Sequence, residues 1–260
     1  MNQSSQKTGI FNASDFSHLR LMSWNLWFDD YYLVERMMMV LSYIEPLQPH
    51  IIAFQELTTV SELLLEDSES PLYGNFFKVK SKLPDWQWYW EGIYSRLPIG
   101  QKSIRYPYSI SEMGRGITIL HVPKFSLTVG CTHLESENEH ETRRRQIMEA
   151  IEWINSFNSR NKIILGDTNI RDHQPIDDLL PSDWCDVWLK LNPYQTGYTV
   201  DSIRNPMCIG NRLDRLDRIY CSCRDYHPRA IYLIGDQEIG EGETAVMPSD
   251  HFGLVLDLER

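Results

Sequence analysis

The chain has 260 residues, of which 42% are hydrophobic and 23% are charged, an ordinary composition for a globular protein with one large domain or two small ones. Its formal net charge of −11 excludes a coat protein that covers nucleic acid with a basic surface. The same charge is compatible with a nuclease, because a metal site needs clustered carboxylates and the bound cation reverses the local sign.

The hydrophobic pattern alternates between strand and helix periods along the chain. We expect residues 1–18 to form a flexible leader and residues 19–260 to form a single domain. Strands are predicted at residues 19–24, 51–54, 76–94 (two strands), 117–122, 126–132, 162–165, 216–221, 230–234 and 252–258, and helices at 31–47, 60–66 and 139–157. Many strands with interspersed helices predict two packed mixed sheets flanked by helices, a four-layer αββα sandwich of the α/β class.

Three segments carry more specific expectations. A pair of prolines, the first of them Pro46, is expected to end the first helix. Trp86, Trp88 and Trp90 recur at the two-residue spacing of a strand, so we predict that they face a sheet. Asn, Pro, Gly and Thr are scattered through residues 191–212, which are therefore predicted to form a long surface loop.

The cysteines and the N-terminus bear on the compartment. Five irregularly spaced cysteines, with Cys221 and Cys223 as a lone C-x-C pair, disfavour a zinc site and indicate reduced thiols. Residues 1–9 lack the apolar core of a signal peptide, and no apolar run approaches the length of a membrane span. We therefore expect a soluble intracellular protein, cytoplasmic or nuclear, that has no membrane partner. We further expect a monomer.

Polar clusters adjoin five of the predicted strands. These clusters are Trp24–Asn25, Gln55–Glu56, Thr132–His133 and Gly166–Asn169, each at the end of an apolar strand, and Ser249–His251 at the start of the last strand. Strands that share a sheet can bring such ends to one rim, and rims of this kind are common ligand sites in layered α/β folds. The sequence therefore predicts one functional site built from all five clusters.

The residue types in these clusters fit a site for a hard cation and a phosphoryl group. Mg²⁺ prefers carboxylate oxygens and retains several waters. Glu56 and Asp250 are suitable metal ligands, and Asn25 is the candidate that completes the shell. Asp167 is suited to orienting or activating a water, and Asn169 to holding the phosphate or the nucleophile. The alternative for these last two residues is a local turn stabilised by their own side chains.

A histidine can stabilise the charge that develops on a phosphate oxygen. His251 is the candidate, and single donors of this kind contribute about 10²–10³ in rate. Such a histidine usually has a carboxylate that fixes its ring, and Asp217 is the candidate for that role. The alternative partners of Asp217 are the neighbouring Arg215 and Arg218.

Together these motifs resemble the endonuclease/exonuclease/phosphatase superfamily. The segments that carry the resemblance are Ser23–Asn25, Phe54–Leu57, Tyr94–Ile99, Thr132–Ser136, Gly166–Asn169, Arg215–Ile219 and Ser249–Leu254, in the superfamily's order and across about residues 19–258. The longer run Gly166–Asp172 is most similar to the tyrosyl-DNA phosphodiesterases within it. Phe252 departs from that branch, which usually has Trp there.

The resemblance implies roles for further residues. It marks six substrate-binding candidates, which are Arg171, Trp188, His133, Ser136, Arg115 and Arg143. Other interpretations stay open for several of them. His133 has a structural role in the tyrosyl-DNA branch, Trp188 is either a core residue or a stacking platform for a terminal base, and Arg143 belongs to a basic run that is more often a solvated helix face.

The resemblance further implies Mg²⁺-dependent, or alternatively Mn²⁺-dependent, hydrolysis of 5′-phosphotyrosyl bonds at DNA ends. Such an enzyme binds DNA and removes covalent topoisomerase-type adducts in DNA repair. A phenol, whose pKa is about 10, leaves far more easily than an alkoxide. Other members of the superfamily act on RNA ends, on phospholipids or on inositol phosphates, so these substrates are the alternatives. A binding module on an inactive nuclease scaffold is the alternative outside enzymes.

Overall fold

The computed structural model describes residues 17–79, 86–137, 139–174, 176, 178–240 and 246–260. Most of the predicted leader, residues 1–16, lies outside the described residues. The first sheet consists of β13 (His227–Ile234), β14 (Gly253–Glu259), β1 (His18–Asn25), β2 (Ile51–Thr58), β4 (Tyr89–Ser95) and β3 (Phe77–Lys78), in that order. The second consists of β5 (Ile104–Pro107), β6 (Gly116–Val122), β7 (Leu127–His133), β8 (Asn161–Asp167), β12 (Asp217–Cys223) and β9 (Cys185–Asp186).

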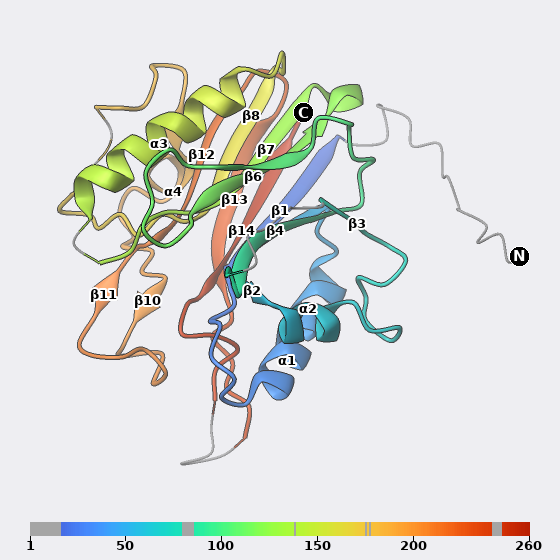
Figure 1. Cartoon of the computed structure of the whole chain (residues 1–260), viewed down its shortest axis with the longest axis vertical. Coiled ribbons are helices and arrows are strands. Elements are labelled where there is room, and N and C mark those ends of the chain that lie inside the picture. Colours follow the sequence, from blue (N-terminus) through green and yellow to red (C-terminus); the bar gives the residue numbers. More distant parts are fainter. Residues whose placement is uncertain (1–16, 80–85, 138, 175, 177, 241–245) are drawn as a thin grey trace, which may run out of the picture.

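α1 (Leu33–Leu47) and α2 (Thr59–Leu65) lie on the outer face of the first sheet, and α3 (His140–Asn155) lies on the outer face of the second (Figure 1). α4 (Val187–Leu191) contacts β12 of the second sheet and β13 of the first, and a 3₁₀ turn, η2 (Pro123–Phe125), joins β6 to β7. Two short strands, β10 (Val200–Asp201) and β11 (Leu213–Asp214), pair with each other beside the sandwich. None of the helices in the described ranges is long and apolar enough to cross a membrane.

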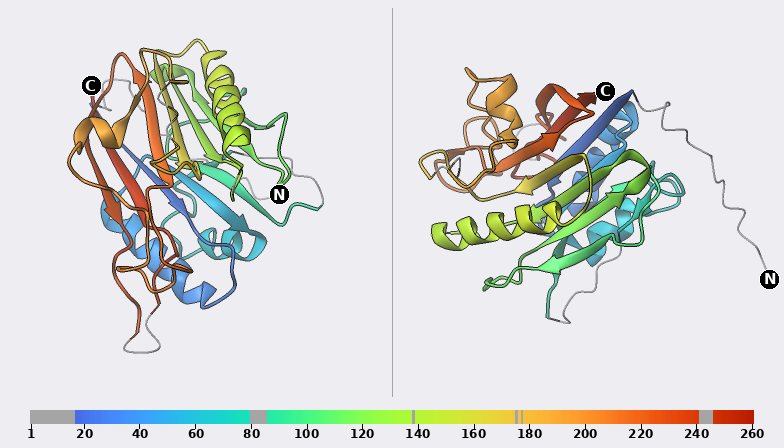
Figure 2. Two further views of the ribbon diagram at one scale, coloured as in Figure 1. Left: turned by 90° about the vertical axis from the view of Figure 1, so that its left-hand side faces the viewer. Right: turned by 90° about the horizontal axis from the view of Figure 1, so that it is seen from above.

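Three apolar clusters separate the four layers. Side chains such as Leu21 of β1 and Val129 of β7 are fully buried in the cluster between the two sheets. Met37 and Ile44 of α1 belong to a second cluster on the outside of the first sheet. Ile147 of α3 belongs to a third, on the outside of the second sheet. The predicted four-layer αββα sandwich is therefore confirmed, and two further views show the two sheets face to face (Figure 2).

The connections of the strands bring the five polar clusters to one rim. β1 and β2 are parallel neighbours joined through α1, and β7 and β8 are parallel neighbours joined through α3. Parallel strands end at the same edge, so Asn25 lies beside Gln55 and His133 lies beside Asp167. β12 runs antiparallel to β8 and therefore begins where β8 ends, with Asp217 paired to Asp167.

The first helix ends at Leu47, between Pro46 and Pro49, as predicted. Two other local predictions were wrong. Trp86 and Trp88 do not face a sheet, because β4 begins after them and their side chains are 63% and 57% exposed. Residues 191–212 are not a simple surface loop, since they contain β10 and several buried side chains.

Candidate active site

A bulge in β2 directs Glu56 into the rim. The pairing of β2 with β4 shifts register between Phe54 and Leu57, and Glu56 adopts a left-handed backbone with a φ of 59°. Bulges of this kind redirect a side chain, and a left-handed non-glycine residue costs about 1–3 kcal/mol that the surroundings must offset. The backbone N–H of Phe28 donates to Glu56 Oε2 at 2.9 Å, which holds the carboxylate in place.

Close approach of two strands positions Asp167. Gly166 has a φ of 140°, and a Cβ atom there would lie 2.0 Å from the carbonyl oxygen of Thr132, so no other residue fits without displacement. Asp167 Oδ1 accepts the backbone N–H of Asn169 at 2.9 Å, and Asn169, with a φ of 51°, donates its side-chain amide to the carbonyl of Leu134 at 3.2 Å. The segment is therefore a side-chain-stabilised turn that presents Asp167 to the rim.

Asn25 joins the carboxylates of Glu56 and Asp167. Its side-chain Nδ2 donates to Asp167 Oδ2 at 3.0 Å and to Glu56 Oε1 at 3.3 Å. Its Oδ1 accepts the backbone N–H of Trp27 at 2.9 Å, which fixes the orientation of the amide. Asn25 thus directs N–H groups at two carboxylates that come from different sheets. Its role as a metal ligand stays a prediction.

His133 is held between a cation and the same two carboxylates. Arg115 Nη1 lies 2.7 Å from His133 Nδ1. Because a guanidinium can only donate, Nδ1 is the acceptor and Nε2 carries the ring proton. That Nε2 lies 3.3 Å from Asp167 Oδ2 and 3.9 Å from Glu56 Oε1. In this arrangement the Nε2–H of His133 points at the carboxylates, so His133 is not placed as a general base.

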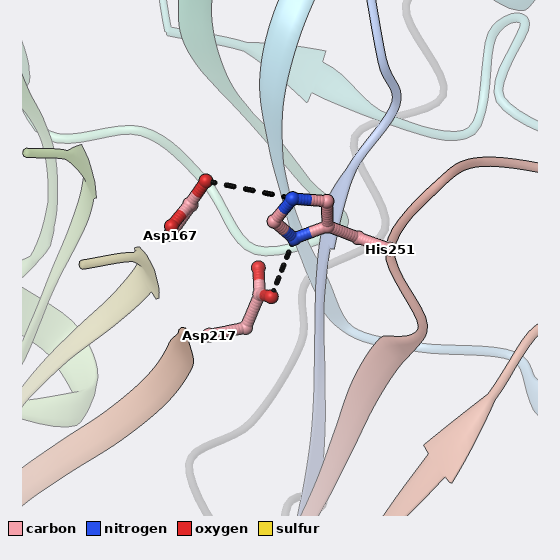
Figure 3. Close-up of side chains that lie close together, drawn as sticks. All are labelled: Asp167, Asp217 and His251. Atoms are coloured by element: carbon pink, nitrogen blue, oxygen red, sulfur yellow. Dashed lines mark hydrogen bonds and ion pairs between the residues drawn. The ribbon is translucent and has the colours of Figure 1, made fainter. Parts of the chain in front are cut away.

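The opposite side of Asp167 faces a second imidazole. Figure 3 shows His251 between Asp217 and Asp167, with Nδ1 at 2.7 Å from Asp217 Oδ2 and Nε2 at 3.9 Å from Asp167 Oδ2. Burial opposes the charged form, but Asp217 and two further carboxylates raise the pKa of His251 well above its usual value. Both ring nitrogens therefore carry protons at neutral pH, as a donor to a phosphate oxygen requires.

The alternative partners of Asp217 are occupied elsewhere. Arg215 Nη1 donates to Asp186 Oδ2 at 2.8 Å, and Arg218 Nη1 to the same oxygen at 3.2 Å. Asp217 therefore binds the histidine, as predicted from the sequence, and not the neighbouring arginines. The backbone N–H of Asp217 donates to Thr199 Oγ1 at 3.1 Å, so a residue of the predicted loop fixes the backbone at Asp217.

The pKa values of Asp167 and Asp250 shift in opposite directions because the surroundings of the two carboxylates differ. Burial alone would raise the pKa of Asp167, but His133, His251 and the N–H of Asn169 hold it well below its usual range. Asp167 is therefore a stable anion that orients a water better than it removes a proton. Burial raises the pKa of Asp250 to about 6, and Glu56 and Asp167 add to this effect against the opposing influence of His251.

The donor set fits a divalent cation. Glu56 Oε1 and Asp167 Oδ2 lie around the same Asn25 amide, and carboxylate oxygens are the ligands of hard cations. Burial is the main cause of the raised pKa of Asp250, and the nearby carboxylates Glu56 and Asp167 add to it, a contribution that a bound cation would offset. Ligand atoms of Asp167, Asp217 and His251 also lie within 4.8 Å of one another. A protonated His251 cannot ligate a metal, so Glu56 and Asp167 remain as candidate ligands, and the predicted metal-ligand role of Asp250 stays a prediction.

One residue that supports the site was not predicted. Arg36 of α1 is fully buried, and its guanidinium hydrogen-bonds backbone carbonyls on both loops that carry site residues. The acceptors are the carbonyls of Leu26 (2.5 Å), Trp27 (2.6 Å), Asp29 (2.8 Å), Tyr31 (3.0 Å) and Pro248 (3.2 Å). Arg36 thus fixes the loop after Asn25 to the loop before Asp250. The sequence could have indicated the burial of Arg36, because its spacing in α1 places it on the same face as the buried Leu33, Val40 and Ile44.

Two predicted substrate contacts are contradicted. Trp188 is 4% exposed, packs in the core between the sheets and donates its indole N–H to the carbonyl of Gln195, so it is no stacking platform. Arg143 is 1% exposed, and its Nη1 donates to the carbonyls of Glu135, Ser136 and Glu137. Burial of Trp188 on α4 and of Arg143 on α3 removes both side chains from contact with a substrate.

Two other candidates remain accessible. Arg171 and Ser136 are partly exposed, and Ser136 Oγ lies 3.1 Å from the sulfur of Met113. Arg115 is buried but reaches the rim through His133, and its guanidinium carbon lies 5.2 Å from the centre of the Tyr89 ring. The substrate-binding roles of these three residues stay predictions.

Comparison with known proteins supports the same assignment of fold. The chain is similar to TDP2 of D. rerio complexed with a single-strand DNA product, with a TM-score of 0.79 and 23% identity over 94% of this chain and 100% of that one. It is similar to truncated TDP2 of Caenorhabditis elegans, with a TM-score of 0.80 and 24% identity over 94% and 98%. A mannosyl-6-phosphatase of Bacteroides thetaiotaomicron matches with a TM-score of 0.69 and 16% identity over 93% and 100%.

At these identities the solved structures establish the fold alone. No curated protein matches the sequence. The model of the endonuclease/exonuclease/phosphatase family matches residues 22–251, which include every strand-end cluster of the rim. Its members are phosphoesterases and nucleases, which makes this chain a member of a family of hydrolases. The chain belongs to the endonuclease/exonuclease/phosphatase family.

Proposed function

We propose that this protein is a divalent-metal-dependent phosphodiesterase that hydrolyses 5′-phosphotyrosyl bonds at DNA ends, with Mg²⁺ as the metal and Mn²⁺ as its substitute. The observation that carries the proposal is the arrangement of two oppositely disposed imidazoles around Asp167, with Glu56 beside it. Asp167 has a candidate cation site on one side and the charged imidazole of His251 on the other. Phosphodiester hydrolysis uses both a cation and a charged hydrogen-bond donor to stabilise the transition state.

The site residues have separate proposed roles in hydrolysis. Glu56 and Asp167 would hold a divalent cation, which would supply positive charge beside the phosphate. Asp167, anionic at neutral pH, orients the attacking water, while Asn169 holds the turn that presents it. The protonated His251 donates through Nε2 to a phosphate oxygen as negative charge develops there. Water oxygen bonds to phosphorus, the bond from phosphorus to the tyrosine oxygen breaks, and a 5′-phosphate end and tyrosine are released.

An aromatic wall at the rim supports an aromatic leaving group. The ring of Tyr89 lies 6.4 Å from the ring of His133, and the Arg115 guanidinium lies over its face. A phenolic ring beside Tyr89 would lie within reach of this cation, whose field favours the phenolate that leaves. The likeness to TDP2 of D. rerio, whose structure holds a single-strand DNA product, supports DNA as the other half of the substrate.

A defined substrate tests the proposal. We expect the wild-type protein with Mg²⁺ to convert a 5′-tyrosyl oligonucleotide to the 5′-phosphate product. His251→Gln should lower kcat by about 10²–10³ because it removes the charged donor. His227→Gln, which changes an exposed histidine on β13, is the matched control and should retain full activity. Hydrolysis of an RNA end, a phospholipid or an inositol phosphate without release of tyrosine would overturn the substrate assignment and leave the family assignment intact.

Calorimetry tests the metal site without measuring turnover. Titration with Mg²⁺ should show binding to the wild-type protein and at least tenfold weaker binding to Glu56→Gln, because the substitution removes an anionic ligand but keeps the shape. Glu238→Gln, at an exposed position, is the control for a general loss of negative charge. Equal affinities of wild type and Glu56→Gln would remove Glu56 from the cation site.

A further inference from the structure

Two polar pockets lie at the end of the sandwich opposite the rim, where Figure 1 shows the C-terminus. The first has a volume of about 320 Å³ and lies where α3 leads into β8. The second has a volume of about 380 Å³ and is lined by residues of η2 and by Arg260. Arg160 lines both pockets. β8 runs from Lys162 in the first pocket to Asp167 at the rim, so roughly 17 Å separates the two ends at about 3.3 Å per residue. A ligand bound at this end does not touch the reacting groups.

The two pockets carry positive charge on a protein that is acidic as a whole. Five of the side chains that line them are basic and two are acidic, whereas the chain has a formal net charge of −11. A concave surface whose charge is opposite to that of the surrounding protein concentrates the electrostatic field and attracts an anion. We call the five basic side chains the distal basic region; they are Lys124, Arg160, Lys162, Arg224 and Arg260.

Lys162 and Arg224 in the first pocket have no acidic partner that neutralises them. Lys162 Nζ donates to Asn155 Oδ1 at 2.8 Å, and this neutral acceptor positions the ammonium group without cancelling its charge. Asp183, a carboxylate of the same pocket, instead accepts the hydroxyl of Ser222 at 2.6 Å. Within the described ranges of the chain, neither Lys162 nor Arg224 forms an ion pair, so both charges are available to a ligand.

Arg160, between the two pockets, is held in place before any ligand binds. Its Nε and Nη2 donate to Asp225 Oδ1 at 2.9 and 2.8 Å. The carboxylate is fixed in turn by the fully buried Asn161, whose Nδ2 donates to Asp225 Oδ2 at 3.1 Å and whose Oδ1 accepts the backbone N–H of Asp225 at 2.9 Å. The Arg160 side chain nevertheless remains 57% exposed. A cation that is positioned in advance loses little conformational entropy when an anion binds to it.

The lining of the pockets distinguishes between two classes of anionic partner. Single-stranded nucleic acid is normally bound by exposed aromatic rings on which bases stack, but the aromatic residues here, Phe125, Phe157 and Tyr226, are buried. The carboxylates of Asp183 and Asp225 also oppose a duplex, which carries a negative charge about every 1.7 Å along its axis. An acidic polypeptide places its carboxylates at wider intervals, and arginine binds carboxylates with two parallel hydrogen bonds. The pockets therefore fit an acidic polypeptide better than a nucleic acid.

We propose that the distal basic region binds an acidic segment of a partner protein. The partner would be attached at the end of the sandwich away from the rim, so that the rim stays open to its substrate. This inference goes beyond the proposed hydrolysis and does not depend on which phosphodiester the rim cleaves.

Fluorescence anisotropy at low ionic strength tests the inference with three labelled probes. The probes are a ten-residue peptide of alternating Glu and Ser, the same peptide with Gln in place of Glu, and a single-stranded DNA of ten nucleotides. We expect the wild-type protein to bind the Glu–Ser peptide at least tenfold more tightly than the Gln–Ser peptide. Added salt should weaken this binding, because salt screens exposed charges. The double variant Lys162→Gln/Arg224→Gln should bind the Glu–Ser peptide at least tenfold more weakly than the wild type.

Two further variants provide the controls. Arg144→Gln/Lys190→Gln also removes two cations from the protein surface, but both residues lie outside the pockets, so its affinity for the Glu–Ser peptide should match that of the wild type. His251→Gln changes the rim and should also bind this peptide normally.

Three results would overturn the inference. The first is equal affinity of the wild type for the Glu–Ser and Gln–Ser peptides. The second is equal affinity of the wild type and Lys162→Gln/Arg224→Gln for the Glu–Ser peptide. The third is a larger loss of affinity for single-stranded DNA than for the Glu–Ser peptide in that double variant, which would assign the distal basic region to nucleic acid.

Discussion

Asp217 Oδ2 accepts a hydrogen bond of 2.7 Å from His251 Nδ1, and this bond crosses from one sheet of the sandwich to the other. Asp217 begins β12 in the second sheet, whereas His251 precedes β14 in the first. The carboxylate keeps the imidazole charged and fixes its ring, so that Nε2 faces Asp167 (Figure 3). The charge state of the donor therefore depends on how the two sheets are packed.

Asp217→Asn tests this dependence on charge. Asn can still accept from Nδ1, but it carries no negative charge, so the pKa of His251 should fall. The raised pKa keeps His251 protonated at pH values at which an ordinary histidine is neutral. The variant should therefore lose the imidazolium, and with it activity, at a lower pH than the wild type does. We expect the alkaline limb of the kcat/KM profile to shift to lower pH and activity near neutrality to fall by about 10–100-fold. Asp178→Asn, which changes an exposed carboxylate, is the control and should keep the wild-type pH profile. If the alkaline limb of the Asp217→Asn profile did not shift, the charge of Asp217 would not be what keeps His251 protonated.

Gly166→Ala should destabilise the fold and displace the adjacent Asp167. The new methyl group would lie 2.0 Å from the Thr132 carbonyl oxygen, and the φ of 140° is unfavourable for alanine. We expect the free energy of unfolding in urea to fall by about 3 kcal/mol. Gly210→Ala also has a positive φ, 84°, but meets nothing within 4 Å. It should cost only about 1 kcal/mol, so equal losses in the two variants would show that the contact with Thr132 does not matter.

Arg36→Met should weaken both loops that it joins. Methionine fills the same space, but it leaves buried carbonyls such as those of Leu26 and Trp27 without a donor. Burial lowers the pKa of Arg36 to about 10, so the wild-type side chain remains charged at neutral pH. We expect the free energy of unfolding to fall by about 3 kcal/mol and Mg²⁺ affinity to fall with it. Arg144→Met, which removes a surface partner of Asp178, should leave both nearly unchanged. Wild-type stability of the Arg36→Met protein would contradict the role of Arg36 in joining the two loops.

His50 should make the protein less stable in acid. Burial, followed by the neighbouring cations His18, Arg96 and Arg20, lowers the pKa of His50 from 6.5 to about 4, and its Nδ1 accepts the backbone N–H of Arg20 at 3.0 Å. The unfolded chain therefore binds a proton more readily, so stability present above pH 6.5 is lost as pH falls toward 4. Urea unfolding across this range should show a smaller loss for His50→Asn, which can still accept from Arg20. The exposed His227→Asn should follow the wild type, and parallel curves for wild type and His50→Asn would contradict the prediction.

The strand pattern and the strand-end clusters were readable from the sequence because both are local. An apolar run such as residues 163–165 predicts β8, and the polar residues that follow it mark the rim. Residues 191–212 were misread because their Asn, Pro and Gly content indicates a loop. Yet Thr199 and Asn205 of this segment hydrogen-bond Asp217 and Ser249, and those contacts depend on distant partners. Trp86 and Trp88 had strand spacing, but no partner strand reaches them in the described residues.

The sequence by itself determined the layered α/β class and which carboxylates, amides and histidines end the strands, because alternation and strand boundaries are properties of neighbouring residues. Only the tertiary structure decided that Asp217 binds His251 instead of Arg215 or Arg218, and that Asn25 joins Glu56 to Asp167. Such pairings depend on atoms within about 3 Å of each other. Packing of the two sheets sets these distances between residues far apart in the chain, so no local pattern contains them.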